Sequence, residues 1–571
     1  MCSNIRIVSR VVVAVVSTLL VGATDAQQGT GRPAASPGSV EGAKVEQRSM
    51  GEGPAAQVQA SFDGLGVGLD GPHGTSTGRN PSDNSVAVGP NHIVQTVNSK
   101  LAIFTKQGAM FETTGRVLVG AVNTNTLFAG FGGTCEARNN GDAVVRYDQL
   151  ANRWLVVMPI FRRAEARDDQ PAVPKPGGPA QVSVPGVAGQ PGAPAKLAPP
   201  ETTPEPPPTG RGRGAGAGQP PAGQPPAPTG PFSMCYAIST TDDPTGEYYR
   251  YEFLRPLFPD YPRPAVWPDG YYVPTSTGDD VIEKHACVVE RAKMLKGEPA
   301  SEQCLIIGDV NFLNNADLDG TRLPPSRSPN MMLATGGSQL TGDLDDDGVY
   351  VWNFVVDWDT SSKTMLSPVQ KIPVAPYTYL CGGQLTNCVP QVGAERRLDA
   401  QGDKLMARVV YRRVAQGRAS YESVVAVHSV DTESAAGGVR WYEFRVNPDR
   451  SLRLYQQGTY APDGNYRWMA SPAIDKFGNI GIGYSFGGPG VFAGQRFSGR
   501  RPIDPPGQLA LREVSLVEGA AAQTNTLRWQ DYSQTAIDPS DDCTIWYVGD
   551  YYKEGASSYS TRIGGFKLPG C

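Results

Sequence analysis

The feature that most constrains the fold of this chain is a degenerate repeat of paired apolar strands. In each copy, two apolar runs flank a turn built on Pro, Asp, Asn or Gly, which are the residue types that hold the bent or left-handed backbone of a short hairpin. The copies recur about every 60 to 75 residues once one insertion is set aside. They lie at 85–94, 143–157, 264–273, 397–407, 471–482 and 534–548, with a less regular copy beginning near Asn330.

A strand pair repeated in this way, with further strands between the copies, is typical of the blades of a β-propeller. We therefore expect an all-β fold, a β-propeller of about seven blades that spans residues 61–571. The 67 glycines, 50 prolines and 19% charged residues agree with many short strands and turns. One short helix is expected at 290–295, where good helix formers cluster. A pair of large β-sandwiches is the alternative fold.

The first 26 residues have the three-part pattern of a cleavable secretory signal. Arg6 and Arg10 precede an apolar run from Val11 to Leu20, and small residues continue to Ala26. The run is shorter than the roughly 20 residues that cross a bilayer, which disfavours the alternative of a membrane anchor. We therefore expect a secreted or periplasmic protein with no membrane span. Residues 27–60 are predicted to be a flexible leader, because they are rich in Gly, Ala, Gln and Ser.

The cysteines support export. Loss of Cys2 with the signal would leave eight of the nine cysteines, and an even number in an exported chain indicates a disulfide framework. Zinc is disfavoured, because no two cysteines are separated by two residues. Free buried thiols are the alternative. The order along the chain suggests the pairs Cys135–Cys235, Cys287–Cys304, Cys381–Cys388 and Cys543–Cys571.

One internal segment, at about 164–230, is dominated by Pro, Gly and Ala and carries too little apolar sequence to form a core. It lies between two strand-like runs, Trp154 to Phe161 and Met234 to Ser239. We interpret it as a disordered loop insertion within a blade. The formal net charge of −5 shows no basic surplus, so we expect no nucleic-acid partner, and we expect a monomer.

Charged residues recur just ahead of the first strand of a copy. In a propeller the innermost strand of each blade begins at one mouth of the central channel, so these side chains are predicted to converge there. The alternative is that each aspartate only bonds the amides of its own turn. The residues are Asp83, Asp142, Asp260, Arg397, Arg467 and Asp531.

An Arg-Trp step occurs four times, at Arg153, Arg440, Arg467 and Arg528. Neighbours in a strand point to opposite faces, so one side chain of each pair is expected to pack between blades and the other to meet solvent or ligand. Guanidinium groups bind carboxylates through paired hydrogen bonds, and indole rings suit sugar faces. Packing between blades is the alternative. The candidate ligand-binding residues are Asp142, Asp260, Arg397, Arg440, Arg467, Trp468, Arg528 and Trp529.

Two adjacent predicted strands carry a histidine, His428, and an acid, Glu443, which together could supply a general acid or base. A core histidine is the alternative, because its strand is apolar. The motifs Gly-x-Ser-x-Gly and His-Glu-x-x-His do not accompany it. The candidate catalytic residues are Asp83, His428, Glu443 and Asp531.

A calcium loop is partly matched by Asp343, Asp345 and Asp347, which alternate ahead of a turn glycine. Val351 and Phe354 stand where a complete loop has oxygen ligands. We therefore expect Ca²⁺ as the one candidate cofactor, with a solvated acidic turn as the alternative.

The closing segments 528–533, 538–547 and 561–567 resemble a group of large, exported bacterial proteins of uncharacterised function that have a sialidase-like propeller. The resemblance extends back through Arg467 and Asp142 to Asp83, and it implies the propeller fold but no agreed activity. The Ser-x-Asp-x-Gly-x-Thr-Trp box of true sialidases is absent. We expect a protein that binds an extracellular ligand, a glycan, at the channel mouth. A hydrolase or lyase that acts on polysaccharide from the same mouth is the alternative.

Overall fold

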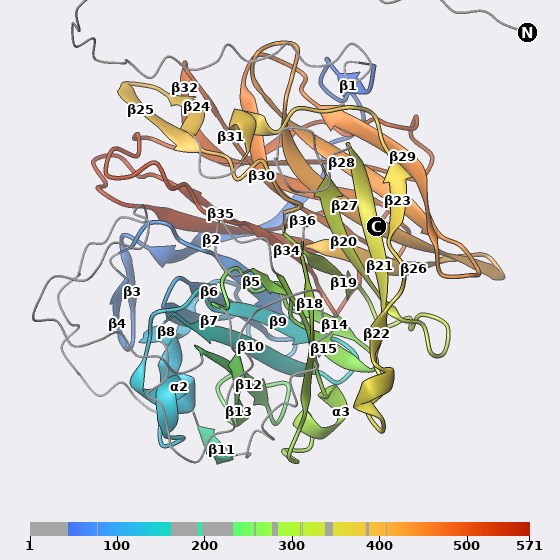
Figure 1. The fold of residues 1–571 in the computed structure, drawn as a ribbon. Coiled ribbons are helices and arrows are strands. Elements are labelled where there is room, and N and C mark those ends of the chain that lie inside the picture. Colours follow the sequence, from blue (N-terminus) through green and yellow to red (C-terminus); the bar gives the residue numbers. More distant parts are fainter. Residues whose placement is uncertain are drawn as a thin grey trace, which may run out of the picture. The chain divides into compact units, whose positions relative to one another are not determined.

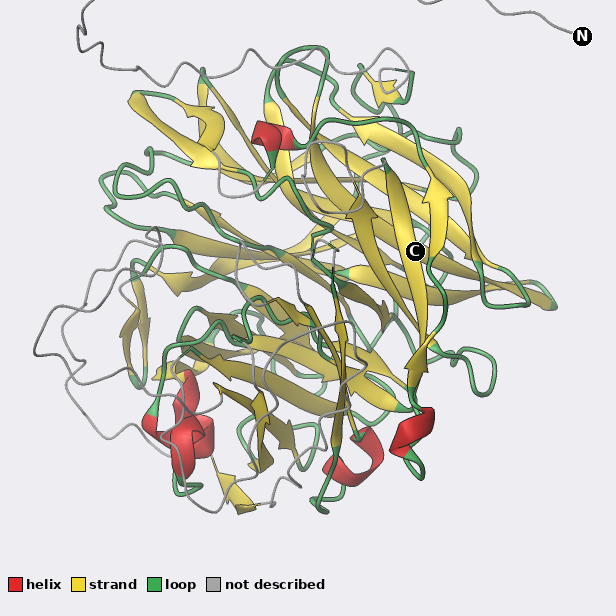
Figure 2. Cartoon of the chain, in the orientation of Figure 1, coloured by secondary structure: helices red, strands yellow, loops and turns green. Residues whose placement is uncertain are grey.

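The structure, a computed structural model, is built almost wholly from β-strands (Figures 1 and 2). The predicted signal, residues 1–26, and most of the predicted insertion lie outside the part that it describes. Within the insertion, the backbone of 192–196 forms one short strand. The described residues are 44–76, 78–161, 192–196, 232–255, 258–276, 284–308, 310, 312–336, 347–383, 387–406 and 408–571.

Strands that follow one another in the chain pair antiparallel and form meanders. The first meander contains β5 (Ser85–Val88), β6 (His92–Val97), β7 (Lys100–Thr105) and β8 (Val117–Asn123). The second contains β9 (Val144–Asp148), β10 (Arg153–Ile160), β12 (Phe232–Ser239) and β13 (Glu247–Arg255), with β11 (Gly192–Lys196) at its edge. The third contains β14 (Ala265–Trp267), β15 (Gly270–Tyr272), β16 (Thr275–Ser276), β17 (Lys284–Val289) and β18 (Glu302–Ile307).

The next two meanders share one sheet, because their first strands, β19 and β26, pair in parallel. One contains β19 (Asn314–Leu318), β20 (Asn330–Gly336), β21 (Gly348–Val355), β22 (Met365–Leu366) and β23 (Gln370–Pro373). The other contains β26 (Val409–Gln416), β27 (Ala419–Asp431), β28 (Gly437–Val446) and β29 (Leu452–Tyr460), with β1 (Glu46–Gln47) parallel to β29.

The last two sheets have four strands each. One contains β30 (Tyr466–Ile474), β31 (Ile480–Gly488), β32 (Val491–Arg500) and β33 (Val514–Val517). The other contains β34 (Gln534–Ile537), β35 (Ile545–Tyr551), β36 (Ser560–Lys567) and β2 (Gln57–Gly66). Two short hairpins complete the strands, β3 (Leu69–Gly71) with β4 (Gly74–Ser76) and β24 (Asn387–Gln391) with β25 (Ala394–Asp399).

Helices are few and short in the described part of the chain. The helix expected at 290–295 is α3 (Arg291–Met294). The others are α2 (Gly133–Ala137) and the 3₁₀ turns η1 (Thr124–Phe128), η2 (Ser361–Lys363) and η3 (Leu380–Gly382). No helix among these residues is long and apolar enough to cross a membrane.

The N-terminal segment is more ordered than its composition indicates. Residues 44–60, expected to belong to a flexible leader, contain β1 and the beginning of β2. β2 pairs antiparallel with β36, and Phe62 on β2 packs against Phe104 with 5.2 Å between ring centroids. The strand thus obtains its hydrogen bonds from β36, a partner that the local sequence does not reveal.

The first strand of each meander contacts the first strand of the next. These contacts run through β5, β9, β14, β19, β26, β30 and β34, and β34 returns to β5. Side chains join neighbouring first strands: Ser85 Oγ accepts from the Val145 amide at 3.1 Å, and Ser471 Oγ accepts from the Thr535 amide at 3.0 Å. The segments that lead into these strands therefore lie close together.

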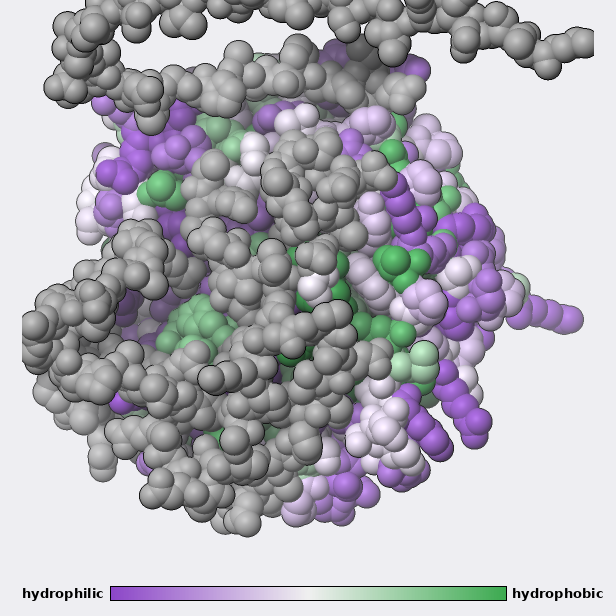
Figure 3. All heavy atoms as spheres, in the orientation of Figure 1, coloured by the Kyte–Doolittle hydropathy of each residue, from purple (hydrophilic) through white to green (hydrophobic). Residues whose placement is uncertain are grey.

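Apolar side chains fill the space between the sheets. Phe497 on β32 stacks on Phe566 of β36 with 3.9 Å between centroids, and Trp267 meets Tyr411 edge-on at 4.8 Å. Offset and edge-on aromatic pairs of this kind each add about 1 kcal/mol beyond burial. On the face seen in Figure 3, hydrophilic side chains dominate the right-hand side, and apolar residues form small separate patches.

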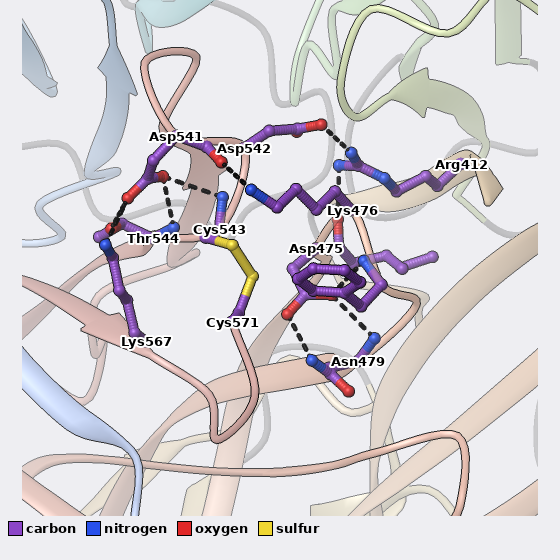
Figure 4. Close-up of a disulfide and its surroundings, with 12 residues drawn as sticks. Arg412, Asp475, Lys476, Asn479, Asp541, Asp542, Cys543, Thr544, Lys567 and Cys571 are labelled. Atoms are coloured by element: carbon purple, nitrogen blue, oxygen red, sulfur yellow. Dashed lines mark hydrogen bonds and ion pairs between the residues drawn. A yellow bond between two sulfur atoms is a disulfide. The ribbon is translucent and has the colours of Figure 1, made fainter. Parts of the chain in front are cut away.

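All four predicted disulfides are confirmed: Cys135–Cys235, Cys287–Cys304, Cys381–Cys388 and Cys543–Cys571. The last ties the C-terminal residue to the turn between β34 and β35, beside an ion pair of 2.8 Å between Lys567 Nζ and Asp541 Oδ2 (Figure 4). Four disulfides are compatible with an extracellular or periplasmic protein.

Candidate functional site

Polar side chains from the segments that lead into the first strands gather in one buried group, which we name the strand-start cluster. Its charged and aromatic members come from the approaches to β5, β9, β14, β19, β26 and β34. The cluster comprises Asp83, Asp142, Tyr261, Arg263, Phe312, Asp399, Gln401, Lys404, Arg528, Asp531 and Tyr532.

Arg528 and Asp531 form the centre of the cluster. Arg528 Nη2 donates to Asp531 Oδ2, and its Nε lies 3.4 Å from Asp399 Oδ2. Gln401 donates to the other carboxylate oxygen of Asp531. Asp399 also accepts from the Trp529 amide at 3.0 Å. One guanidinium therefore holds two carboxyl groups from different meanders.

Two further cations lie on aromatic rings. The guanidinium carbon of Arg263 is 3.2 Å from the ring centroid of Tyr261 and 4.1 Å from that of Tyr532. Lys404 Nζ is 3.8 Å from the centroid of Phe312. Such cation–π contacts are strongest where the groups are desolvated, as they are here. Arg263 is thus fixed by rings, which leaves its Nε and Nη2 without an acceptor in hydrogen-bonding geometry among the described residues.

Asp83 is held in its protonated form. Burial raises its pKa well above the usual value, and the neighbouring carboxylates of Asp142 and Asp531 raise it further. Burial also acts to raise the pKa of Asp531, but Arg528 and the hydrogen bonds that Asp531 accepts outweigh it and lower that pKa to about 2. The two carboxyl groups therefore share one proton, which stays on Asp83. The other Asp83 oxygen accepts from Asn98 at 2.6 Å.

Two more carboxyl groups, Asp399 in the cluster and Asp550 beside it, have raised pKa values. Burial raises the pKa of Asp399 to about 7, although Arg528 opposes the shift. Burial raises the pKa of Asp550 to about 8, against the hydrogen bonds that it accepts from Ser82 and Asn84, each at 2.8 Å. Perturbed carboxyl groups of this kind concentrate at functional sites more often than elsewhere.

The backbone is strained at the same place. A positive φ is uncommon for residues other than glycine, and such strain collects at functional sites because the surrounding fold must hold it. Gly141 adds a close approach, since a Cβ there would lie 1.6 Å from the Pro159 carbonyl oxygen. The residues with positive φ at the starts of first strands are Asp83 (50°), Tyr261 (56°), Gln401 (47°), Met469 (47°), Gln530 (54°) and Asp531 (74°).

The cluster is almost closed. Arg528 is its most exposed member, with 18% of its side chain accessible, followed by Asp142 and Tyr261 at 8% and 7%. Among the described residues, several of its buried polar atoms lack a hydrogen-bond partner, which is costly unless a water or a ligand supplies one. These atoms include Arg263 Nε and Nη2, Arg528 Nε and Tyr532 Oη.

A second buried group, the mid-strand network, lies further along the first strands and consists of Arg146, Asp317, Asp319 and Arg408. Arg408 donates to Asp317 and to Asp319, each at 2.6 Å, and Arg146 Nε lies 3.2 Å from Asp317. A cavity of about 20 Å³ beside them has room for about one water molecule. This network joins β9, β19 and β26.

Several predicted site residues are not members of the strand-start cluster and have other partners. Arg467 binds Glu513 and Asp463 at 2.7 and 2.9 Å, and Arg440 donates to Thr459 and to the Ala375 carbonyl. Arg397 is exposed and donates to the Cys388 carbonyl. Trp468 and Trp529 are both buried and lie 6.1 Å apart. Asp260 accepts from the Tyr261 amide at 2.9 Å.

The predicted His428 and Glu443 are also separate from the cluster. His428 is fully buried, stacks on Tyr442 and shares a hydrogen bond of 2.8 Å with its hydroxyl. Burial, and then Arg440, lower the His428 pKa well below its usual value, so the ring is neutral. Glu443 is bound by Ser423, Arg445 and Gln456. Neither side chain meets the carboxyl pair.

The predicted calcium loop falls mostly outside the described residues, which include Asp347 but not Asp343 or Asp345. Asp347 Oδ2 accepts from the Tyr377 amide at 3.0 Å. Calcium at this loop stays a prediction.

The structure thus brings together Asp83, Asp142, Arg528 and Asp531, as the charge pattern ahead of the strands predicts. The sequence reasoning missed Arg263, Asp399 and Lys404. Asp399 and Lys404 lie within the copy at 397–407, and Arg263 stands directly ahead of the copy at 264–273, so a search of every charge near a copy would have found all three. The stacking of Arg263 on Tyr261 and Tyr532 is visible only in the structure.

No protein-family model matches this chain, and no curated protein matches it by sequence. Among solved structures, a protein of unknown function from Dyadobacter fermentans is similar at 10% identity over 90% of this chain and all of that one, with a TM-score of 0.31. The NanB sialidase from Streptococcus pneumoniae is similar at 9% identity over 75% and 67% of the two chains, with a TM-score of 0.36. An ulvan lyase is similar at 9% identity over 88% and 85%, with a TM-score of 0.23.

Proposed function

We propose that this chain is an exported β-propeller of about seven blades that binds an extracellular glycan where its innermost strands begin. The first strands would be the innermost strands of the blades. Their contacts, which pass from each meander to the next and return from β34 to β5, support that arrangement. The pairing of β2 with β36 supports it too, because a strand from the N-terminal part then completes the last blade.

The observation that carries the binding proposal is the concentration of unmatched polar atoms in the strand-start cluster. Tyr532 Oη can accept or donate, whereas Arg263 Nε and Nη2 only donate. Sugar hydroxyls both donate and accept, so a glycan can satisfy such a mixed set. The strained backbone supports the same conclusion, since it fixes these groups before any ligand arrives.

Access to the cluster would be past Arg528, Asp142 and Tyr261, its most exposed members. Asp142 would accept hydrogen bonds from hydroxyl groups, and the Tyr261 ring would offer an apolar surface. The remaining members would bind deeper groups or ordered waters.

A glycan array and a panel of soluble polysaccharides, applied to the purified mature protein, test this proposal. Asp142→Asn should weaken binding by about tenfold, because a carboxylate acceptor is replaced by a neutral amide. The control is Asp475→Asn, since Asp475 is also a buried aspartate but caps its own turn through the Phe477 and Asn479 amides. Binding that is the same in Asp142→Asn and the parent chain would contradict the proposal.

One observation favours a catalytic alternative, a hydrolase or lyase acting from the same site. A protonated Asp83 beside an ionised Asp531 has the opposed protonation states of an acid and a base. The two carboxyl groups are hydrogen-bonded to each other, however, and glycosidase pairs are separated by about 5 Å or more. Release of reducing ends or of unsaturated uronate from a polysaccharide panel, lost in Asp83→Asn, would establish this alternative.

A further inference from the structure

A second hollow lies far from the strand-start cluster, between β29, β1 and the loop at 501–508. It measures about 340 Å³, which is within the range of small-ligand sites. Its lining is rich in amide side chains and contains one aromatic ring. The residues that matter here are Lys44, Glu46, Gln47, Tyr455, Gln457 and Gln508.

The walls of this hollow are held by specific bonds. The Gln47 side-chain amide makes two hydrogen bonds to the Leu509 backbone: it accepts from the amide at 2.8 Å and donates to the carbonyl at 3.1 Å. Gly507 donates its amide to Gln456 at 3.0 Å, and the loop lies so near β29 that a Cβ on Gly458 would be 2.1 Å from the Gly507 carbonyl oxygen. The hollow is therefore a fixed feature of the fold.

Tyr455 projects into the hollow because of a β-bulge. Glu443 on β28 pairs with Gln456, whereas the next residue, Phe444, pairs with Leu454, so Tyr455 is the extra residue on β29. A bulge re-aims one side chain without breaking the sheet, and bulges are frequent beside functional sites. The Tyr455 side chain is 51% exposed, which is unusual for a large aromatic residue in a sheet of this size.

The exposed ring is nevertheless immobilised. The guanidinium carbon of Arg445 lies 4.0 Å from the centroid of Tyr455 and 4.1 Å from that of Tyr421. Arg445 is in turn bound to Glu443 and, at 3.0 Å, to Ser423. A rigid aromatic platform loses little entropy when a ligand stacks on it.

Hydrogen-bonding groups surround this platform. Gln457 uses its amide oxygen to accept from Ala375 at 3.0 Å, and within the described chain its amide nitrogen has no partner. Gln508 is exposed, and its side chain likewise makes no hydrogen bond to another described residue. Lys44 and Glu46 contribute one charge of each sign to the lining, and Arg445 beside the ring is paired with Glu443, so these groups together add no net charge.

We propose that this hollow is a second saccharide site, which binds a neutral sugar unit against Tyr455 with hydrogen bonds from Gln457 and Gln508. The apolar face of a pyranose stacks on an aromatic ring, and its hydroxyl groups match the amides at the ring's edge. The site goes beyond the function proposed above, because it shares no residue with the strand-start cluster.

Isothermal titration calorimetry of the full mature chain with neutral cello-, xylo-, malto- and galacto-oligosaccharides tests this proposal. Binding of at least one series is expected, weakened about tenfold or more in Tyr455→Ala and changed less than about twofold in Tyr455→Phe, which keeps the stacking ring. Phe477→Ala is the matched control, because Phe477 is 52% exposed and lies on another turn. It should bind like the parent chain, and equal melting temperatures would show that all variants fold.

The proposal is overturned if no neutral oligosaccharide binds, or if Tyr455→Ala binds as well as Tyr455→Phe. Asp142→Asn separates it from the function proposed for the strand-start cluster. Glycan binding that is lost in Asp142→Asn and unchanged in Tyr455→Ala would overturn the second site and leave the first standing. The reverse pattern would support the second site alone.

Discussion

The two buried polar groups along the first strands use the same residue types in different ways. In the mid-strand network, two guanidinium groups face two carboxylates, and all four carboxylate oxygens accept hydrogen bonds. In the strand-start cluster, the carboxyl groups of Asp83, Asp142, Asp399 and Asp531 outnumber the cations, and Arg263 lies on rings instead of on an acid. Cations and carboxyl groups are therefore equal in number in the mid-strand network and unequal in the strand-start cluster.

This difference indicates what each group does. A matched buried network fixes how neighbouring strands sit, since every removal leaves a charge without a partner. An unmatched group contains protonated carboxyl groups, strained backbone and hydrogen-bond donors without acceptors, and each of these lowers stability. Such a group is expected where a ligand supplies the missing partners. The mid-strand network is therefore structural, and the strand-start cluster is the better place for function.

The largest expected effect is that of Arg408→Met. The substitution leaves the buried Asp319 without its ion pair and Asp317 with Arg146 alone, and it should lower the free energy of unfolding by about 3 to 5 kcal/mol. Urea unfolding at pH 7, followed by intrinsic fluorescence, measures it. The control is Arg501→Met, whose 30% exposed side chain binds Asp504 on a loop and should cost less than about 1 kcal/mol. Equal losses in the two variants would contradict a structural role for the network.

Arg528→Met in the strand-start cluster should cost less, about 2 kcal/mol at pH 7. The reason is that Asp399, with a pKa of about 7, is already close to neutral and can take a proton, so only Asp531 is stranded. The deficit should shrink as the pH falls from 7 to 4, because Asp531 then binds a proton as well. Urea midpoints at the two pH values check this, and a deficit that grows in acid would refute it.

Asp550→Asn should remove a slope of about 1.4 kcal/mol per pH unit from the dependence of stability on pH. The folded pKa of Asp550 is about 8, against 3.8 for an unperturbed aspartate. The unfolded chain therefore loses this proton first, and the parent chain loses stability as the pH rises from about 4 to about 8. In Asp550→Asn that loss should be absent.

Asp541→Asn is the control for that measurement, because its shift has the opposite sign. Burial acts to raise the pKa of Asp541, but Lys567 and the hydrogen bonds that Asp541 accepts outweigh it and lower that pKa to about 2. Its contribution is lost only as the pH falls below about 4. The slope between pH 5 and pH 8 should thus be the same as in the parent chain, and a change there would show that the Asp550 assignment is wrong.

The smallest expected change in stability is that of Asp83→Asn, less than about 1 kcal/mol at pH 5. The amide is neutral, as the protonated carboxyl is, and it can still donate to Asp531 and accept from Asn98. Chemical denaturation at pH 5 measures this. A loss of several kcal/mol would mean that Asp83 is ionised in the folded protein.

The sequence predicts much of the fold because turn chemistry marks the hairpins. The copies at 85–94 and 471–482 coincide with β5–β6 and with β30–β31 around the Asp475 turn. The less regular copy is displaced, since the meander begins at β19 and not near Asn330, where β20 begins. β19 reads Asn-Asn-Ala-Asp-Leu, and hydropathy does not reveal a strand whose Asp317 belongs to a buried ion network.

The candidate site is predictable only in part for a related reason. Charges ahead of the strands point to Asp83, Asp142 and Asp531, because the position of a residue relative to a turn is local. The copy at 397–407 is displaced as well, as residues 400–406 form a loop and β26 begins at Val409. That loop carries Gln401 and Lys404 into the cluster. Their placement depends on Asp531 and Phe312, which are distant in the sequence.

The pairing of β2 with β36 has a consequence for how the chain matures. Gln57 lies opposite Lys567, so β2 stays without its partner strand until β36 has been synthesised, about 500 residues later. Contacts of such large sequence separation form late, because a long loop must close before they contribute any stability. A ribosome that stalls before β36 would therefore release a chain with an unpaired, aggregation-prone strand.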